Sequence, residues 1–288
     1  MTNGYKVLIT GVKGQLGYDV LERLKTLNID CIGVDKEDFD LTDESKTKDF
    51  IIQYKPDVVI HCAAYTAVDK AEDEKEVCYA VNVNGTKYIA EACKELNAKM
   101  VYISTDYVFD GTKEGLYDIM DRPNPINYYG YTKYLGEEIV KENLKKYFIV
   151  RISWVFGKNG NNFVKTMLRL GKERKELKVV SDQVGSPTYT YDIAKLLSQM
   201  IQTEKYGVYH ATNEGYCSWY EFASEIFTLA SFDVSVLPIK TEEYPSKAKR
   251  PKNSRMSKKS LIDAGFPLLR DWREALKDFY NVIKKDFA

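Results

Sequence analysis

The stretch that decides the fold is KVLITGVKGQLGYDVLERL, residues 6–24. Residues 6–10 are a short apolar run of the kind that forms a buried strand, and a glycine-rich turn follows directly. Residues 15–27 then carry leucine and valine at helical spacing, which predicts a helix packed on that strand. A strand, a glycine-rich turn and a helix in this order are typical of the first unit of a nucleotide-binding α/β sheet.

The turn contains Gly11, Gly14 and Gly17, spaced as GxxGxxG. One glycine permits the tight turn, another lets the backbone approach a pyrophosphate, and the third lets the helix pack closely on the strand. The free N–H groups and positive dipole end at the start of the helix favour an anion. The pattern therefore predicts a dinucleotide-phosphate site, although a plain strand-to-helix turn would also account for a lone glycine pattern.

The rest of the first half alternates strand and helix patterns. Strands are expected at residues 31–34, 57–61, 99–104 and 148–152, and helices at residues 45–54, 75–96 and 128–144. Strands separated by helices of this length form parallel βαβ units. We therefore predict an α/β fold with a Rossmann-type, doubly wound parallel sheet.

The second half is less regular and predicts a smaller C-terminal substrate-binding lobe. The expected elements are helices at 162–171, 191–201, 218–230 and 272–285, a strand at 207–210, and a polar, basic loop at 240–259. We assign residues 1–155 to a dinucleotide-binding domain, to which residues 181–212 return. Residues 156–180 and 213–288 are assigned to the lobe.

Composition limits the function. The 288 residues include 42 Lys+Arg and 42 Asp+Glu, so the formal net charge is zero and a nucleic-acid partner is not expected. No apolar run approaches the ~18 residues that a membrane span needs, and no secretory signal precedes the first strand. The five cysteines are scattered and only two histidines occur, which argues against a disulfide framework or a metal centre. We expect a cytoplasmic protein.

A candidate cofactor contact follows the second expected strand. Asp35 stands 18 residues after Gly17, where a carboxylate can accept both hydroxyls of an adenine ribose and repel the 2′-phosphate of NADP. Lys36 follows directly and would weaken that repulsion. Asp40 and Leu41 stand where a loop could cover the adenine. An ordinary turn or capping role for Asp35 is the alternative.

The candidate catalytic group is Tyr129 with Lys133, a YxxxK pair on one helix face. The lysine cation would lower the pKa of the tyrosine and suit it to give a proton to a carbonyl oxygen. The pair follows a strand that ends in Ser104-Thr105-Asp106, and the carboxyl ends of strands hold the ligand site in open α/β sheets. Thr105 could then hydrogen-bond the same substrate oxygen.

Two further YxxxK pairs occur, at Tyr191/Lys195 and Tyr280/Lys284. Neither follows such a strand end, and a chain with 22 tyrosines is expected to contain chance matches to so short a pattern. We interpret both as ordinary helix positions.

Several longer segments occur in an order that resembles the extended short-chain dehydrogenase/reductases. They are GVKGQLG, HCAAYTAVDKAE, STDYVFDG, YYGYTKYLGE, RISWVFGKNGNNF, DQVGSPTYT and RPKNS, and they cover nearly the whole chain. The chain resembles most specifically the branch that reduces 4-keto-6-deoxy sugars on dTDP, through the segments GQLG, STDYVF and RPxNS together. The resemblance implies an oxidoreductase that uses NADH, with NADPH allowed, to convert dTDP-4-dehydro-6-deoxy-L-mannose into dTDP-L-rhamnose for cell-surface polysaccharide.

The resemblance also implies roles for the positions that match these motifs. The implied catalytic residues are Thr105, Tyr129 and Lys133. The implied cofactor contacts are Gly11, Gly14, Gln15, Leu16, Gly17, Asp35, Asp40, Leu41, Ala63, Ala64, Tyr65, Tyr129 and Lys133. The implied substrate contacts are Thr105, Asp106, Trp154, Asn162, Phe163, Arg250, Asn253 and Ser254. No metal ligand set is expected, the expected partner is a dTDP-sugar, and a homodimer is allowed.

Other interpretations stay open. The chain could be another nucleotide-sugar reductase or epimerase of the superfamily, or a non-catalytic regulatory subunit similar to that of eukaryotic methionine adenosyltransferase. Trp154 could be a core residue, and His61 is interpreted as a structural, hydrogen-bonded histidine. Arg250 is favoured over its basic neighbours as a diphosphate ligand, because its bidentate donors suit that group.

Overall fold

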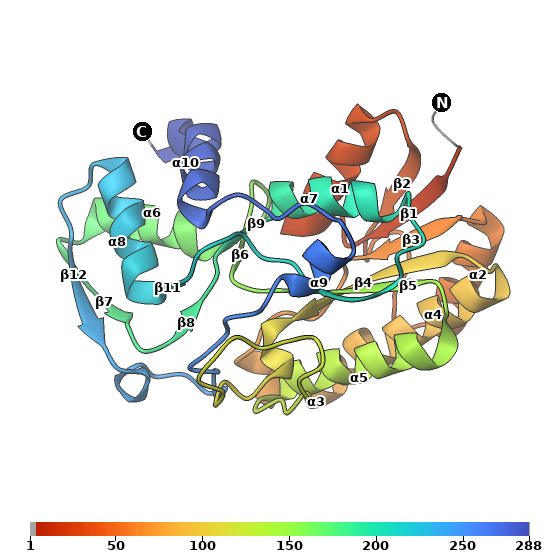
Figure 1. Cartoon of the computed structure of the whole chain (residues 1–288), viewed down its shortest axis with the longest axis horizontal. Helices are drawn as coiled ribbons and strands as arrows, with labels where there is room; N and C mark the ends of the chain where they lie inside the picture. The colour runs from red at the N-terminus through yellow and green to blue at the C-terminus, as the bar shows by residue number, and fades with distance from the viewer. Residues whose placement is uncertain (1–3, 288) are drawn as a thin grey trace.

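The structure, a computed structural model, describes residues 4–287, and a six-stranded parallel sheet forms its centre (Figure 1). The strands are β1 (Lys6–Thr10), β2 (Asp30–Val34), β3 (Val58–His61), β4 (Lys99–Thr105), β5 (Tyr147–Ile152) and β10 (Gly207–His210). Their order is β10-β5-β4-β3-β1-β2, and every neighbouring pair is parallel. The chain reverses its direction of winding between β1 and β3, so the predicted doubly wound sheet is confirmed. A ligand crevice is expected at that point.

Helices cover both faces of the sheet (Figure 1). The helices of one face are α1 (Gln15–Thr26) and α7 (Thr190–Met200), and those of the other are α2 (Glu44–Tyr54), α4 (Thr86–Glu95) and α5 (Tyr128–Asn143). On α1, Leu16, Val20 and Leu24 recur every fourth residue and are all buried against the sheet. This spacing is what makes a helix in the glycine-rich segment pack on β1.

The helix expected at residues 75–96 contains a local change of winding. It begins as α3 (Lys75–Tyr79), passes through the π-helical segment η2 (Ala80–Gly85) and continues as α4. Such π-helical turns inside longer helices are frequent at functional sites. Two single 3₁₀ turns also occur, η1 (Lys70–Glu72) and η3 (Asp106–Val108).

The lobe has a hydrophobic core of its own. Its helices and longer strands are α6 (Phe163–Glu173), β7 (Glu176–Val180), α8 (Trp219–Ala230), β12 (Ser235–Ile239) and α10 (Trp272–Ile283). Shorter elements complete this half: β6 (Val155–Phe156), β8 (Val184–Gly185), β9 (Thr188–Tyr189), β11 (Cys217–Ser218), η4 (Thr241–Glu243), α9 (Lys259–Asp263) and η5 (Lys284–Phe287). The parallel pair β7/β12 was not predicted, because its strands lie far apart in sequence and share no local turn signal.

The chain crosses between the sheet and the lobe more than once. Elements β10 and α7, from residues 181–212, belong to the sheet and to a helix layer beside it. Leu261, Phe266 and Leu269 fall in the range assigned to the lobe, yet they pack into the core of the sheet. The domain boundaries themselves stay a prediction.

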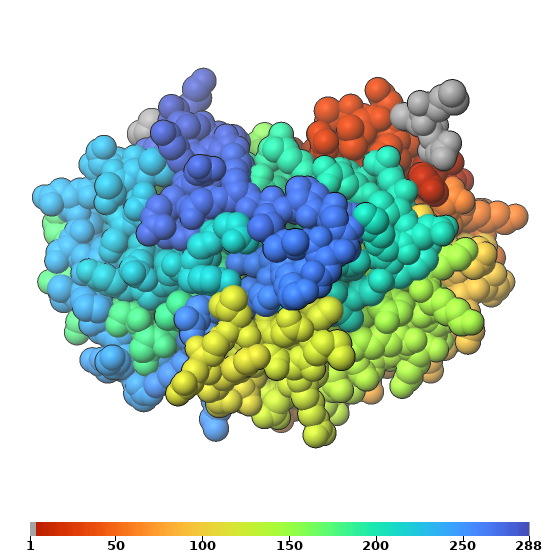
Figure 2. All heavy atoms as spheres, viewed as in Figure 1, coloured from red at the N-terminus to blue at the C-terminus, as the bar shows by residue number. Residues whose placement is uncertain are grey.

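Two distant segments meet over the carboxyl ends of the strands. Tyr117 and Met256 form an isolated parallel bridge, and the Tyr117 N–H donates to the carbonyl of Arg255 at 2.8 Å. Figure 2 shows the two segments side by side, in yellow and blue. Within residues 4–287, no helix is long and apolar enough to cross a membrane.

Candidate active site

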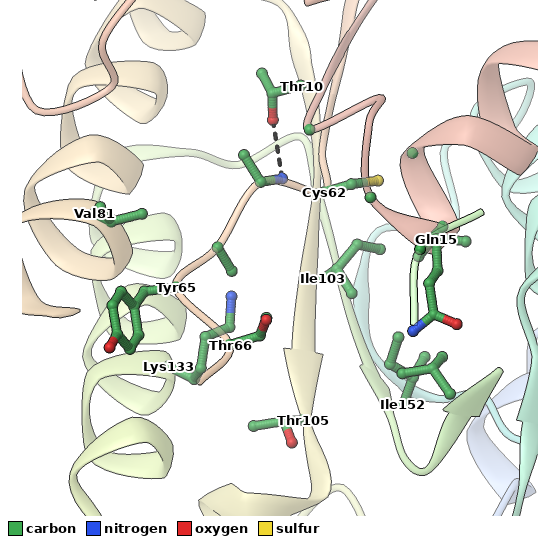
Figure 3. Close-up of a pocket in the computed structure, with 18 of the residues that line it drawn as sticks. Thr10, Gln15, Cys62, Tyr65, Thr66, Val81, Ile103, Thr105, Lys133 and Ile152 are labelled. Carbon is green, nitrogen blue, oxygen red and sulfur yellow. Dashed lines mark hydrogen bonds between the residues drawn. The ribbon is translucent and has the colours of Figure 1, made fainter. Parts of the chain in front are cut away.

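A cavity of about 1110 Å³ opens at the carboxyl ends of the central strands. Its wall combines the glycine-rich turn, the segment after β3, the ends of β4 and β5, and the first turns of α5 (Figure 3). Phe163 and Trp219 close it from the lobe. The cavity therefore lies where the winding of the sheet reverses, and it is large enough for a dinucleotide beside a second ligand.

The glycine-rich turn has the geometry predicted for a phosphate-binding loop. Gly11 has φ +73°, and a Cβ at this position would stand 2.6 Å from the backbone nitrogen of Ala63. A Cβ at Gly17 would collide with the carbonyl oxygen of Gly11, so α1 approaches β1 only because this residue has no side chain. Gly14 precedes α1 without a side-chain cap, which leaves the first N–H groups of the helix available to an anion.

The carboxylate of Asp35 lies at the end of β2 on the cavity wall. It accepts the N–H of Lys13 at 2.8 Å and the N–H of Lys36 at 2.9 Å. The ammonium of Lys13 pairs with Glu37 at 2.9 Å, so cations and anions alternate around this carboxylate. Asp40 and Leu41 also line the cavity, as do Gln15 and Leu16.

Residues 62–65 run along the cavity from the end of β3. The N–H of Ala63 donates to the Thr10 hydroxyl at 3.2 Å (Figure 3). Asn82 in η2 accepts the N–H of Tyr65 at 2.8 Å and donates to the carbonyl of Tyr65 at 3.1 Å and to the Thr132 hydroxyl at 3.0 Å. Sequence reasoning missed Asn82, although an asparagine inside a continuous helical pattern was a signal.

His61, at the end of β3, is a structural histidine as interpreted from the sequence. Its ring nitrogens lie 2.8 Å from the Thr10 hydroxyl and 3.2 Å from the Thr86 hydroxyl. Burial lowers the pKa of His61 to about 3, so the ring is neutral. Burial raises the pKa of the neighbouring Cys62 to about 12, so its thiol keeps its proton beside the cavity.

Thr105, Tyr129 and Lys133 all line the cavity, from the end of β4 and the first turns of α5. Asn127 caps α5 by accepting the N–H of Gly130 at 2.7 Å. A Cβ at Gly130 would strike the carbonyl oxygen of Tyr107, so this glycine lets the helix begin directly against the end of β4. The sequence thereby brings the three predicted catalytic side chains to one wall.

The electrostatics of the pair differ in part from the expectation. Burial raises the pKa of Tyr129, and the charge of Asp106 raises it further against a hydrogen bond from Thr105. The expected lowering by Lys133 does not prevail, since burial dominates. Burial also lowers the pKa of Lys133 to about 7, against the attraction of Glu137. Tyr129 therefore holds its proton at neutral pH, which suits a proton donor.

Asp106 is a buried carboxyl group with a free acceptor. Its Oδ1 accepts the Thr105 hydroxyl at 3.0 Å, whereas its Oδ2 has no hydrogen-bond partner among residues 4–287. Burial raises the pKa of Asp106 to about 6, with Ser254 and Thr105 acting in the opposite direction. A buried acceptor without a partner on a cavity wall is suited to a ligand hydroxyl.

Aromatic side chains form the lobe side of the cavity. Trp154 has φ +49° and stacks on Trp219 with ring centroids 3.7 Å apart, and Phe163 lies 4.6 Å from Trp219. All three line the cavity, so Trp154 is not a plain core residue. Trp219 was missed from the sequence, where only its place after the Ser218 helix cap marked it.

Comparison with known proteins identifies the family. The family model described as RmlD substrate binding domain matches residues 5–285. A dTDP-4-dehydrorhamnose reductase from Aggregatibacter actinomycetemcomitans is 42% identical over 286 residues, covering 95% of this chain and 97% of the relative. The chain belongs to the dTDP-4-dehydrorhamnose reductase family. The Bacillus subtilis spore coat polysaccharide biosynthesis protein SpsK is 40% identical over 274 residues, covering 95% of this chain and 96% of SpsK.

Solved structures agree with this family. The dTDP-4-dehydrorhamnose reductase from Bacillus anthracis, in complex with NADP, is 47% identical with a TM-score of 0.94, covering 97% of this chain and 99% of that one. The UDP-glucose 4-epimerase of Thermus thermophilus, in complex with NAD, has a TM-score of 0.82 at 18% identity, covering 97% of this chain and 99% of that one. The epimerase shares the fold of the dTDP-4-dehydrorhamnose reductase family.

Three of the implied substrate residues hydrogen-bond to other groups of the protein and are not among the residues that line the cavity. Arg250 donates to both carboxylate oxygens of Asp69, at 3.1 and 2.7 Å. Asn253 donates to the carbonyls of Lys113 and Gly115, at 2.6 and 2.8 Å. Asn162 caps α6 and donates to Gln15 Oε1 at 3.0 Å. Their roles in binding substrate stay predictions for this member of the reductase family.

The two other YxxxK pairs stand apart from the cavity wall. The ammonium of Lys195 lies 4.1 Å from the ring centroid of Tyr191, which is 39% exposed. Tyr280 packs against the core of the lobe on α10. Within residues 4–287, no group of three or more His, Cys, Asp or Glu side chains is arranged to hold a metal ion.

Proposed function

We propose that this chain reduces the 4-keto group of dTDP-4-dehydro-6-deoxy-L-mannose with NAD(P)H to give dTDP-L-rhamnose. The observation that carries the proposal is the meeting of Thr105, Tyr129 and Lys133 with a phosphate-binding glycine turn in one cavity. Membership of the dTDP-4-dehydrorhamnose reductase family supports the same reaction. A cytoplasmic setting and a homodimer are part of the proposal and rest on the sequence alone.

The residues present fit a nicotinamide dinucleotide. At Gly11 and Gly17 the space that a side chain would need is taken by the backbone of Ala63 and Gly11, which keeps the turn tight. The uncapped start of α1 would then offer its N–H groups to a pyrophosphate. Asp35 would bind the adenine ribose, and Asp40 and Leu41 would lie beside the adenine; all three line the cavity. Ala63, Ala64 and Tyr65 would run along the cofactor, and Lys133 would bind the nicotinamide ribose. The bound cofactor supplies a hydride to C4 of the sugar.

The side chains of the protein would supply the proton and orient the keto group of the sugar. Tyr129 holds a proton at neutral pH and donates it to the sugar O4 as the ketone becomes an alcohol. The Thr105 hydroxyl donates its one proton to Asp106 Oδ1 at 3.0 Å, and it would turn that proton to the same sugar oxygen when the substrate is bound. Tyr129 and Thr105 would then both donate to the oxygen on which negative charge develops.

The sugar nucleotide would extend toward the lobe. Trp154, Trp219 and Phe163 offer flat apolar faces, and the unpaired Oδ2 of Asp106 would accept a sugar hydroxyl. The product, dTDP-L-rhamnose, is a precursor for cell-surface polysaccharide, in keeping with the name of the Bacillus subtilis relative SpsK.

Cofactor oxidation with the purified protein tests the proposal. We expect NAD(P)H to be consumed in proportion to the dTDP-4-keto sugar added, and not when the sugar is omitted. An epimerase would convert the sugar without net oxidation of the cofactor. A regulatory subunit would bind cofactor but consume none, and either result would overturn the proposal. The matching UDP-sugar serves as the control for nucleotide selectivity.

A further inference from the structure

A buried ion pair lies behind the candidate catalytic residues and has no role in the reaction described above. Glu137 on α5 is 0% exposed, and Arg151 on β5 is 1% exposed. Arg151 Nε donates to Glu137 Oε1 at 2.8 Å, and Arg151 Nη2 donates to Oε2 at 2.6 Å. The geometry is the bidentate one that makes arginine–carboxylate pairs rigid.

Neighbouring strands complete the hydrogen bonding of the pair. The Ser104 hydroxyl donates to Glu137 Oε1 at 2.6 Å, and Arg151 Nη1 donates to His210 Nε2 at 3.3 Å. His210 Nδ1 in turn donates to the carbonyl of Ser257 at 3.1 Å. Ser104, Arg151 and His210 are register neighbours on β4, β5 and β10, and Ser104 directly precedes Thr105. The network therefore connects the sheet to α5 next to the cavity.

Glu137 also shares a face of α5 with the candidate catalytic pair. Tyr129, Lys133 and Glu137 follow one another at four-residue intervals, which places them in line along the helix. The ammonium of Lys133 lies 4.1 Å from the ring centroid of Tyr102, and the Tyr102 hydroxyl donates to the carbonyl of Lys133 at 3.2 Å. Lys133 thus lies between the tyrosine that faces the cavity and the buried carboxylate.

The groups that face Lys133 from the elements packed around it carry no other full charge. They are His61 and Cys62 at the end of β3, Cys78 on α3, Tyr102 on β4 and Tyr129 on α5. The pKa of His61 is lowered, and the pKa values of both thiols and both phenols are raised, chiefly by burial. Glu137 is itself faced by Arg151 and, at 3.8 Å, by Lys141.

We propose that Glu137, held by Arg151 and Ser104, is a positioning residue that keeps Lys133 cationic beside the cofactor. A buried ion pair is seldom more stabilising than apolar residues of the same volume, so its presence here calls for a functional reason. An anion fixed one turn behind Lys133 supplies that reason. The inference rests on the proposed function only in giving Lys133 the task of binding cofactor and assisting Tyr129.

The pKa of Lys133 lies near neutral pH, so a change in this pKa on loss of Glu137 can be measured. Burial lowers the pKa of Lys133 to about 7, and the attraction of Glu137 opposes that lowering. Without the carboxylate, Lys133 would lose its stabilising anion and would also face the unpaired cation of Arg151. Both changes lower the pKa of Lys133, and gain or loss of a neighbouring charge shifts a pKa by about 1–3 units, so loss of Glu137 should move the titration lower by about one unit or more.

The test is the pH dependence of reduced-cofactor affinity, followed by fluorescence, and of kcat/KM with the keto sugar. In Glu137→Gln we expect the alkaline limb of both profiles to move to lower pH by about one unit or more. At pH values above the limb, cofactor affinity and kcat/KM should then be about tenfold lower than in the wild type. Glu137→Asp keeps the charge and should keep the limb near its wild-type position. Adding Arg151→Met to Glu137→Gln removes the unpaired cation and should return the limb partway. Glu138→Gln, at a neighbouring position that is paired with Lys141 at 2.8 Å, is the matched control with a wild-type profile.

Two outcomes would overturn the proposal. One is a Glu137→Gln variant that loses affinity or rate equally at all pH values, which a merely structural pair predicts. The other is a double variant whose alkaline limb lies no higher than that of Glu137→Gln. If Glu137→Gln does not fold, the double variant Glu137→Gln/Arg151→Met is compared with Glu137→Asp. The proposal then requires the alkaline limb of the double variant to lie at lower pH than that of Glu137→Asp. The affinity profile needs no sugar turnover, so it reports on the pair even if the proposed reaction is not observed.

Discussion

The glycine turn at residues 11–17 and Arg250 in the basic loop were both expected to bind phosphate groups, and their surroundings in the structure differ. The glycine turn lines the cavity and leaves backbone N–H groups free at the start of α1. In the basic loop, Arg250 gives its donors to Asp69, and Lys247 pairs with Asp73. The loop is thereby joined to the segment around η1, away from the cavity wall.

The difference follows from the kind of donor. The donors of the glycine turn are backbone groups, whose directions are set once Gly11 adopts a positive φ and Gly17 packs against the backbone of Gly11. The donors of the basic loop belong to long side chains, which pair with whichever carboxylate the fold brings near. Local spacing in the sequence therefore specifies the directions of backbone donors, whereas the pairing of long side chains depends on contacts between distant segments.

The largest effect is expected from Tyr129→Phe, in the cavity that the glycine turn also lines. This change removes the proposed proton donor and keeps the ring packing against Tyr107. General acid catalysis contributes typically ~10²–10⁴ in rate, so kcat should fall in that range while NADH affinity stays nearly unchanged. Steady-state kinetics with the keto sugar and a cofactor titration measure the two quantities.

The matched controls are Tyr191→Phe and Tyr280→Phe, at the two YxxxK pairs away from the cavity. Both variants should keep wild-type kcat. Substantial turnover by Tyr129→Phe would mean that the proton comes from another group.

Asp106→Asn is expected to increase the stability of the protein at alkaline pH. The pKa of Asp106 is raised from 3.8 to about 6, so the folded state binds this proton more tightly than the unfolded state does. Stability is therefore lost as pH rises from about 4 to 6, by roughly 3 kcal/mol in all. Asparagine carries no charge, so the variant should unfold at a higher temperature than wild type at pH ~8, and the gain should shrink toward pH ~4. A gain that does not change with pH, or a loss at pH ~8, would contradict this account of the strand-end carboxyl group.

The basic loop is tested by Arg250→Ala beside Asp69→Asn. If Arg250 binds the diphosphate, its loss should cost roughly 1.5–3 kcal/mol of sugar-nucleotide affinity and leave cofactor affinity nearly unchanged. Asp69→Asn should then keep or improve sugar affinity, because it frees the guanidinium. Equal losses in both variants, measured by calorimetry with dTDP-sugar, would assign Arg250 to joining the two segments only.

The smallest effect is expected for cofactor choice at Asp35. We expect NADH to bind at least as tightly as NADPH, since the carboxylate repels a 2′-phosphate, with the cation of the next residue, Lys36, moderating the difference. Asp35→Ala should raise NADPH affinity relative to NADH by a few fold. The Bacillus anthracis reductase binds NADP, which makes this the sharpest point of comparison with a relative. A wild-type preference for NADPH that Asp35→Ala leaves unchanged would remove Asp35 from this role.

The sequence predicted the sheet and its strand-end residues because both depend on local patterns. Apolar runs separated by amphipathic helices specify the parallel sheet, and the end of β4 carries Thr105 and Asp106 to the crevice. The β7/β12 pair and the Trp154–Trp219 stack join residues that are distant in sequence, so no local pattern predicted these contacts. Asn82 is a different case: an asparagine inside a helical pattern was a local signal, but its contacts depend on a π-helical turn that the pattern does not show.

The most direct test of the central claim follows the hydride itself. The protein is given reduced cofactor that carries deuterium at the transferred position, together with the dTDP-4-keto sugar, and the product is analysed by mass spectrometry and NMR. We predict that deuterium appears at C4 of dTDP-L-rhamnose in step with cofactor oxidation, and that Tyr129→Phe slows this transfer without changing its position. Unlabelled product, or label at another carbon, would contradict the account.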